Sequence, residues 1–374
     1  MLNEYVVIGG GPSGIVAVVR ILEKLISISS DLTETKKLAK KIVWIDPKFA
    51  VGAFGGAWRN VPGNTPANKY QSVYKEMYLV LKAYDVAPPA SPFQLDFEEP
   101  QYPTLLKTAA QPLQWVTKQL LELVTALQGK VEKITHSSES LNIVVNINEN
   151  IKQVTTKRCI LAIGGAPKTL SLPAHYANKL ISLETALDLV LLKQYVTSHS
   201  EILTAPVLVQ GSSHSAALAV WNLLECGAQV TQIMNKPYAY YENHQHDNDG
   251  LKGKVAEFTR KLVTGEIYTG YWSHSIIADG KIEDYSAFSG VIAAIGFQPV
   301  DTLIVNRNIR SSQIRYDLYN TKTEVPGLFA IGVGYPPAAP DGSKNVGISK
   351  FWPDIGKAVA IWHENPVQLA ALIR

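Results

Sequence analysis

Cysteine is scarce in this sequence: Cys159 and Cys226 are the only two among 374 residues, and they form no CxxC pair. Two distant thiols cannot build a disulfide framework, and their number suits the reducing conditions of a cytoplasm. We therefore expect a cytoplasmic protein whose fold depends on a hydrophobic core.

Long hydrophobic runs and a strong charge of one sign are also missing. The apolar runs are short or broken by glycine and charge, so we expect no membrane span. A glycine-rich turn occupies the place where the apolar core of a secretory signal would stand. The formal net charge is only +3, and the lysines of residues 36–41 are typical of a solvated helix face. These absences exclude nucleic acid as an expected partner, and 46% hydrophobic residues indicate an ordinary globular protein, with a length that suits two domains.

What the chain does contain is a glycine turn near its start. Residues 9–14 read Gly-Gly-Gly-Pro-Ser-Gly, directly after an apolar strand expected over residues 4–8 and at the start of an expected helix. This arrangement is typical of a site for a dinucleotide pyrophosphate. Gly9 is expected to form the tight turn, Gly11 to let the backbone approach the phosphates, and Gly14 to let the helix pack closely.

An acidic residue follows at the end of the next expected strand, over residues 42–46. A carboxylate at Asp46 can accept hydrogen bonds from an adenosine ribose. The polar segment 27–41 places it further beyond Gly14 than the roughly 20 residues usual in this fingerprint. The alternative is that Asp46 is a surface residue at a strand terminus.

A second, altered copy of the unit follows two hundred residues later, with a strand expected over 206–210 and another over 228–234. Gly211 is kept, whereas Ser213 and Ala216 replace the second and third glycines. The Ser213 hydroxyl can donate to a phosphate, and alanine is tolerated where only close helix packing is needed. The alternative is that this copy no longer binds a nucleotide.

The residues after the second unit bear on which nucleotide it takes. No acid follows its second strand; Asn235 and Lys236 stand there instead, which favours NADPH over NADH. His214 lies inside the turn, where it is either a phosphate contact or a partly exposed turn residue.

The remaining expected elements are a loop over 87–103, a helix over 111–128, strands over 131–134, 142–147 and 153–163, a helix over 183–192, strand-to-turn segments at 159–167, 291–296 and 327–332, and a last helix near 355–362.

Four motifs together resemble the two-dinucleotide-binding-domain flavoproteins, the superfamily of thioredoxin-reductase-like enzymes and flavin-containing monooxygenases. They are VVIGGGPSG at Val6–Gly14, LAIGGAP at Leu161–Pro167, VLVQGSSHSA at Val207–Ala216 and VPGLFAIG at Val325–Gly332. The resemblance implies an α/β fold in which a Rossmann-like FAD-binding domain carries an inserted second Rossmann-like NAD(P)-binding domain.

The implied domains are residues 1–170 and 297–374 for FAD and residues 171–296 for NADPH or NADH. In this superfamily the first glycine motif holds FAD and the second holds the nicotinamide dinucleotide. The resemblance thus implies an FAD-dependent oxidoreductase that passes hydride from nicotinamide to flavin and then to oxygen or a small organic acceptor. Its oligomeric state stays open.

Departures from the superfamily pattern refine this expectation. No CxxC exists for a dithiol relay, so we expect no disulfide-reductase activity, and residues 55–58 resemble the GGxW segment of monooxygenase relatives. A monooxygenase-like activity is therefore favoured, although the Phe-x-Gly-x3-His fingerprint is absent near residues 170–182. Val333 replaces the aspartate that many relatives place after the AIG turn. With the altered second motif, Val333 leaves one alternative: an FAD- or nucleotide-binding protein without turnover, acting as a sensor or interaction module.

The candidate site consists of cofactor contacts, without an assigned catalytic residue. The polar group Trp58, Arg59, Asn60 and Asn64 is either at the flavin edge or part of a structural loop. The His- and Asp-containing segment 243–249 is interpreted as a solvated loop, and no metal is expected. The expected cofactor-binding residues are Gly9, Gly11, Pro12, Ser13, Gly14, Asp46, Pro47, Lys48, Gly56, Trp58, Val131, Ala162, Gly164, Gly211, Ser213, His214, Ser215, Asn235, Lys236, Gly332, Val333, Gly347 and Ile348.

Overall fold

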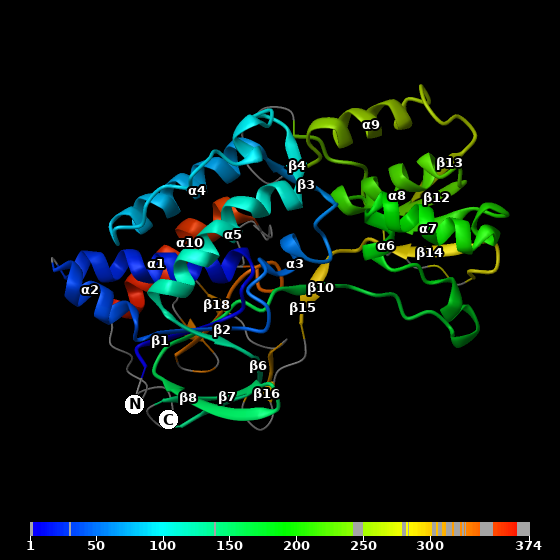
Figure 1. The fold of residues 1–374 in the computed structure, drawn as a ribbon. Coiled ribbons are helices and arrows are strands. Elements are labelled where there is room, and N and C mark those ends of the chain that lie inside the picture. The colour runs from blue at the N-terminus through cyan, green and yellow to red at the C-terminus, as the bar shows by residue number, and fades with distance from the viewer. Residues whose placement is uncertain are drawn as a thin grey trace.

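The chain forms two α/β units, which appear as the left and right halves of Figure 1. A short antiparallel strand pair, β10 (Gly165–Pro167) with β15 (Phe297–Pro299), lies between them. The computed structural model describes residues 3–29, 31–137, 140–241, 250–278, 282, 284–300, 304–305, 309–311, 316–317, 322–323, 325, 327–336 and 347–364.

The first unit is built on a five-stranded parallel sheet in the order β20-β9-β1-β2-β5. Its central strand β1 has β2 on one side and β9 on the other, so the chain order reverses beside β1. In open parallel sheets, ligands bind beyond the carboxyl ends of the strands at such a reversal. The strands are β1 (Tyr5–Ile8), β2 (Ile42–Asp46), β5 (Thr125–Gln128), β9 (Cys159–Leu161) and β20 (Leu328–Ala330).

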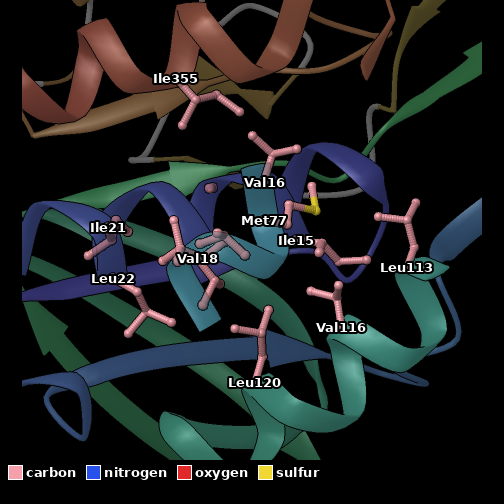
Figure 2. Close-up of a cluster of buried hydrophobic side chains, with 14 of the residues drawn as sticks. Ile15, Val16, Val18, Ile21, Leu22, Met77, Leu113, Val116, Leu120 and Ile355 are labelled. Atoms are coloured by element: carbon pink, nitrogen blue, oxygen red, sulfur yellow. The ribbon is translucent and has the colours of Figure 1, made fainter. Parts of the chain in front are cut away.

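Alternate residues of β1 face two different cores, which explains why the strand is apolar throughout. Tyr5 and Val7 pack among helices, whereas Val6 and Ile8 pack against a β-meander. Figure 2 shows the helical side, where residues of α1 meet Met77, Leu113 and Ile355 from three other helices. The helices are α1 (Pro12–Ile28), α2 (Leu32–Ala39), α4 (Ala67–Lys82), α5 (Leu106–Leu123) and α10 (Ile348–Glu364); the meander is β6 (Lys130–His136), β7 (Leu141–Ile147) and β8 (Asn150–Thr156).

The second unit repeats the plan with a four-stranded parallel sheet in the order β13-β12-β11-β14. Here β11 stands at the reversal, in the position that β1 holds in the first sheet. Its elements are β11 (Val207–Gln210), β12 (Val230–Met234), β13 (Trp272–Ile276), β14 (Gly290–Ala293), α6 (Leu183–Leu187), α7 (Leu189–Ser198), α8 (His214–Glu225) and α9 (Gly253–Val263).

Several expected element boundaries were wrong. The helix expected over 111–128 runs from 106 to 123, and β5 follows it, because residues 125–128 pair with β2. The polar segment 27–41 contains α2, whose first turn is capped by the Asp31 side chain.

Smaller elements are α3 (Gly52–Gly55), β3 (Pro62–Pro66), β4 (Pro103–Leu105), β16 (Ile304–Val305), β17 (Ile309–Arg310), β18 (Tyr316–Asp317), β19 (Lys322–Thr323) and 3-10 turns at Gln94–Phe97, Ala174–Lys179 and Ser200–Leu203.

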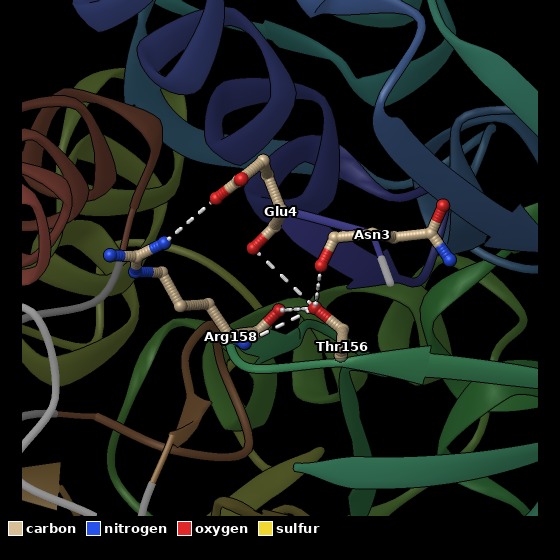
Figure 3. Close-up of polar contacts among 4 residues, drawn as sticks. All are labelled: Asn3, Glu4, Thr156 and Arg158. Carbon is tan, nitrogen blue, oxygen red and sulfur yellow. Dashed lines mark hydrogen bonds and ion pairs between the residues drawn. The ribbon is translucent and has the colours of Figure 1, made fainter. Parts of the chain in front are cut away.

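A polar cluster anchors the start of β1 to the turn between β8 and β9 (Figure 3). The buried Thr156 hydroxyl lies within hydrogen-bond distance of the carbonyl oxygens of Asn3 and Arg158, at 3.1 and 3.0 Å, and shares its one hydrogen between them. It also accepts from the Arg158 backbone N–H at 3.1 Å. Arg158 also pairs with the Glu4 carboxylate at 3.1 Å. These contacts hold β9 beside β1, and therefore hold Ala162 next to the glycine turn.

Among the helices that the structure describes, none has both the length and the apolar composition to cross a membrane.

Candidate nucleotide-binding sites

Gly9 and Gly14, two of the glycines in the first turn, are required by the protein itself. Gly9 has φ +115°, and a Cβ there would overlap the Ala162 carbonyl oxygen. A Cβ on Gly14 would overlap the Gly9 carbonyl oxygen. The turn is therefore compressed between α1 and β9, as expected for a helix that starts directly over its strand.

Gly11 is different, because no described residue requires it to be glycine. It is the N-cap of α1 with φ −79°, and among the described residues a Cβ there would meet the Gly52 Cα alone, at 3.9 Å. The N-cap makes no side-chain hydrogen bond to the first turn of the helix. Open space in front of a helix start without a side-chain cap fits a pyrophosphate.

Asp46 is tied to the glycine turn through its carboxylate. Its Oδ2 accepts from the Gly10 backbone N–H at 2.6 Å, and its Oδ1 accepts from Lys48 and Phe49 at 2.8 and 2.6 Å. An ionised carboxylate offers about four acceptor positions, so room is left for a ribose hydroxyl. The Pro47 and Lys48 side chains are exposed beside it.

A strained loop presses against the same turn. Phe49, Val51 and Gly52 have φ of 49°, 60° and 54°. A left-handed conformation is costly for a β-branched residue such as Val51 and marks a backbone that its surroundings hold in place. A Cβ on Gly52 would lie 2.9 Å from the Gly11 Cα. Gly52 was missed as a site residue, and its only sequence signal was its place in a glycine-rich segment.

Residues far along the chain also reach the start of α1. Gly332 lies two residues after the end of β20 and has φ +107°. A Cβ there would lie 2.8 Å from the Ser13 Oγ. Gly164 has φ +80° with open space around it, and Val333 is partly exposed. The structure thus brings the AIG turns of the two distant motifs together with the first glycine turn.

Other expected contacts are placed less directly. The Val131 side chain lies in the core between the sheet and the meander, and Val131 pairs with Val145 in the meander. Gly347 and the buried Ile348 stand at the start of α10, which packs along α1. Trp58 packs edge-on against Phe297, with ring centroids 6.0 Å apart, and joins the core of the second unit.

The second glycine turn repeats the geometry of the first. The Trp44 indole N–H donates to the Gly9 carbonyl at 2.9 Å, and the Gln232 amide donates to the Gly211 carbonyl at 2.8 Å. A Cβ on Gly211, at φ +131°, would overlap the Ala294 carbonyl, as one on Gly9 would overlap Ala162. The altered copy has therefore kept the backbone geometry of a dinucleotide turn.

The two replaced glycines are accommodated. Ser213 is the exposed N-cap of α8, and its side chain makes no capping hydrogen bond to its own helix. Ala216 is fully buried, and its Cβ fits beside Gly211. At the end of β12, Asn235 accepts from the Ser212 hydroxyl at 3.3 Å, and Lys236 is exposed next to it.

His214, the first residue of α8, connects this turn to the first unit. Its Nε2 lies 3.0 Å from the Pro62 carbonyl oxygen. Burial, with a smaller contribution from the nearby Lys252 charge, lowers the pKa of His214 to about 4. The imidazole is therefore neutral at pH 7, with its hydrogen on Nε2, because a carbonyl can only accept. The buried Nδ1 has no hydrogen-bond partner among the described residues.

The polar group after Gly56 lies at the junction of the two units. The Asn60 side chain donates to the Asp188 carboxylate at 2.9 Å, and the Asn64 side chain donates to the Gly250 carbonyl at 3.0 Å. The Asn64 Oδ1 is buried and has no hydrogen-bond partner in the part of the chain that the structure describes. Lys252, which the sequence analysis did not single out, lies near His214 at this junction. No local sequence pattern distinguishes it from an ordinary surface lysine.

The described residues hold no group of three or more His, Cys, Asp or Glu side chains suited to a metal ion. Segment 243–249 lies outside the described residues.

The two parallel sheets, each with a glycine turn at its point of reversal, define a protein with two dinucleotide-type sites. The family described as pyridine nucleotide-disulphide oxidoreductase matches residues 3–333. The chain belongs to this family. The resemblance to two-dinucleotide-binding-domain flavoproteins and the expected α/β fold are thereby confirmed.

Individual relatives differ in their named activities. The chain is 26% identical to Monooxygenase AgnR1 of Paecilomyces divaricatus, over 96% of this chain and 97% of that protein. Its fold is similar to that of the ornithine N-hydroxylase KtzI of Kutzneria sp. 744, with TM-score 0.62, 13% identity and coverage of 97% and 99% of the two chains. It is also similar to the bacillithiol disulfide reductase Bdr of Bacillus cereus, with TM-score 0.61, 15% identity and coverage of 96% and 98%.

Proposed function

We propose that this chain is an FAD-dependent, NAD(P)H-using oxidoreductase of monooxygenase type, acting on a small-molecule substrate. The observation that carries the proposal is the repeated turn geometry, in which Gly9 and Gly211 each face the carbonyl of an equivalent alanine. The similarity to a named monooxygenase along nearly the whole of both chains supports the monooxygenase type. Two scattered cysteines suit a cytoplasmic location.

In this proposal the first turn binds FAD and the second binds the nicotinamide dinucleotide. When bound, FAD accepts a hydride from the nicotinamide and passes the electrons to oxygen or an organic acceptor. The chain's own residues bind and orient: Gly11 leaves room for the FAD pyrophosphate, and Asp46 accepts from its ribose. Ser213 donates to the second pyrophosphate, and Lys236 favours the additional phosphate of NADPH. Residues 1–170 with 297–374 and residues 171–296 are the proposed domains.

Disulfide reduction is not part of the proposal, although the family's description and one structural neighbour name it. Cys159 is buried, and burial raises the pKa of its thiol. Burial also raises the pKa of the half-buried Cys226. A thiol kept protonated is a poor nucleophile, and the two lie in different cores of the fold.

The test is an absorbance spectrum of purified protein, loaded with FAD and titrated with NADPH or NADH without oxygen. The proposal expects a flavin spectrum that NADPH bleaches and that oxygen restores. Bound FAD that neither nucleotide bleaches would instead favour a binding protein without turnover. A protein that cannot be loaded with FAD would contradict both functions.

A further inference from the structure

His214 carries a buried ring nitrogen whose hydrogen-bonding capacity no described residue satisfies. The Nε2–H of this residue is used by the Pro62 carbonyl, at 3.0 Å. Its Nδ1 is consequently a lone-pair acceptor, and it is buried with no hydrogen-bond partner among the described residues. A buried acceptor without a donor is costly, so a ligand that donates a hydrogen bond would relieve it.

The place of His214 in the fold restricts that ligand. It follows Ser213, the N-cap where the second pyrophosphate would lie, and it faces the strand β3 of the first unit through Pro62. In the proposed function, a nicotinamide dinucleotide bound at this turn extends from the end of β12 towards a flavin in the first unit, the unit that His214 contacts through Pro62. Phosphate oxygens cannot satisfy the Nδ1, because at neutral pH they are acceptors themselves. The first donors beyond the pyrophosphate are the hydroxyls of the next ribose.

We propose that the Nδ1 of His214 accepts a hydrogen bond from a hydroxyl of the ribose that links the pyrophosphate to the nicotinamide. This inference rests on the proposed function, since it requires the second turn to bind a nicotinamide dinucleotide. His214 is then a positioning residue: its Nε2 holds Pro62 of the first unit, and its Nδ1 holds the half of the nucleotide that must reach that unit. A pKa lowered to about 4 keeps the Nδ1 lone pair available at any pH near neutral.

Two substitutions separate the two nitrogens. In His214→Gln the side-chain amide reaches the Nε2 position and can still donate to Pro62, but no acceptor remains at Nδ1. In His214→Asn the side-chain oxygen stands near the Nδ1 position, whereas the contact with Pro62 is lost. The pair therefore tests the ribose contact independently of the contact between the units.

The experiment is isothermal titration of the FAD-loaded protein with ADP, ADP-ribose and NADP+, because only ADP lacks the second ribose. Wild type is expected to bind ADP-ribose more tightly than ADP. His214→Gln is expected to bind ADP-ribose about tenfold more weakly than wild type, with ADP affinity unchanged, while His214→Asn keeps the preference for ADP-ribose. Thermal unfolding of both variants confirms that they fold.

Three results would overturn the inference. The first is that His214→Gln retains the full gain from the second ribose. The second is that both variants bind ADP and ADP-ribose equally more weakly, which is the effect of a purely structural role. In either case, binding of NADP+ by wild type leaves the proposed function standing. Wild-type protein that binds neither ADP-ribose nor NADP+ would remove the second nucleotide site, and with it both the inference and the NAD(P)H-dependent function.

Discussion

The carboxylate of Asp46 accepts a hydrogen bond from the backbone N–H of Gly10, with N and Oδ2 2.6 Å apart. The end of the second strand is thereby tied to the first glycine turn. We expect Asp46→Asn to lower the free energy of unfolding by about 1–3 kcal/mol, because an amide cannot accept through both of its terminal atoms. It should also weaken FAD binding. Urea unfolding and FAD titration measure the two effects; Lys41→Ala, at an exposed residue just before the same strand, should change neither.

The glycines at 11 and 14 are expected to respond differently to the same change. Gly11→Ala should leave the stability of the FAD-free protein unchanged and reduce FAD loading, since its Cβ would enter only the proposed ligand space. Gly14→Ala should destabilise the fold by about 3 kcal/mol or more, because its Cβ would overlap the Gly9 carbonyl. Thermal unfolding without FAD, followed by FAD titration, compares them. Equal unfolding temperatures for the two variants would contradict the difference.

Lys236 is expected to decide between the two nicotinamide dinucleotides. It is exposed at the end of β12, beside the Asn235 that Ser212 contacts. Lys236→Ala should weaken NADPH binding about tenfold through loss of a charge-assisted hydrogen bond and leave NADH affinity unchanged. Titration of the FAD-loaded protein with each nucleotide checks this. A parallel loss for NADH would place Lys236 elsewhere in the site.

His214, a partly buried residue whose Nδ1 is buried, predicts a loss of stability in acid. Its pKa is lowered to about 4 in the fold, from 6.5 when unfolded, so the unfolded chain takes up the proton first as pH falls. The contribution of the neutral imidazole to the free energy of unfolding is complete above pH 6.5. It is lost as pH falls towards 4, which lowers the free energy of unfolding by up to about 3 kcal/mol. Urea unfolding of wild type and His214→Gln between pH 7.5 and 4 isolates the effect, since other groups titrate in both. An equal decline in the two proteins would show that the histidine is not buried neutral.

Thr156 is expected to support the first sheet through the contacts of Figure 3. Thr156→Val leaves the Arg158 backbone N–H and the Asn3 carbonyl without this partner and should cost about 1–3 kcal/mol. The matched control is Thr155→Val, which removes one partly exposed bond to Asn142 and should cost less than about 1 kcal/mol. Urea unfolding of both variants tests the ordering, and a larger loss for Thr155→Val would reverse it.

The sequence by itself determined the parts of this protein that depend on neighbours along the chain. The apolar strand, glycine turn and helix start around Gly9 and Gly14, and their copy at Gly211, were predicted because a turn of this kind needs particular residues at fixed spacing. Helix α5 was placed about five residues too late at both ends, because the strand character of residues 125–128 comes from pairing with β2.

Only the tertiary structure decided which distant groups meet. The Asp46 bond to Gly10, the approach of Gly52 to Gly11, and the contact of His214 with Pro62 all join residues whose separation along the chain carries no pattern. Their energies arise from burial and from hydrogen bonds that exist only once both sheets are assembled. The glycine motifs therefore identify two nucleotide-type turns, whereas the buried Nδ1 of His214, which no described residue contacts by a hydrogen bond, appears only in the folded chain.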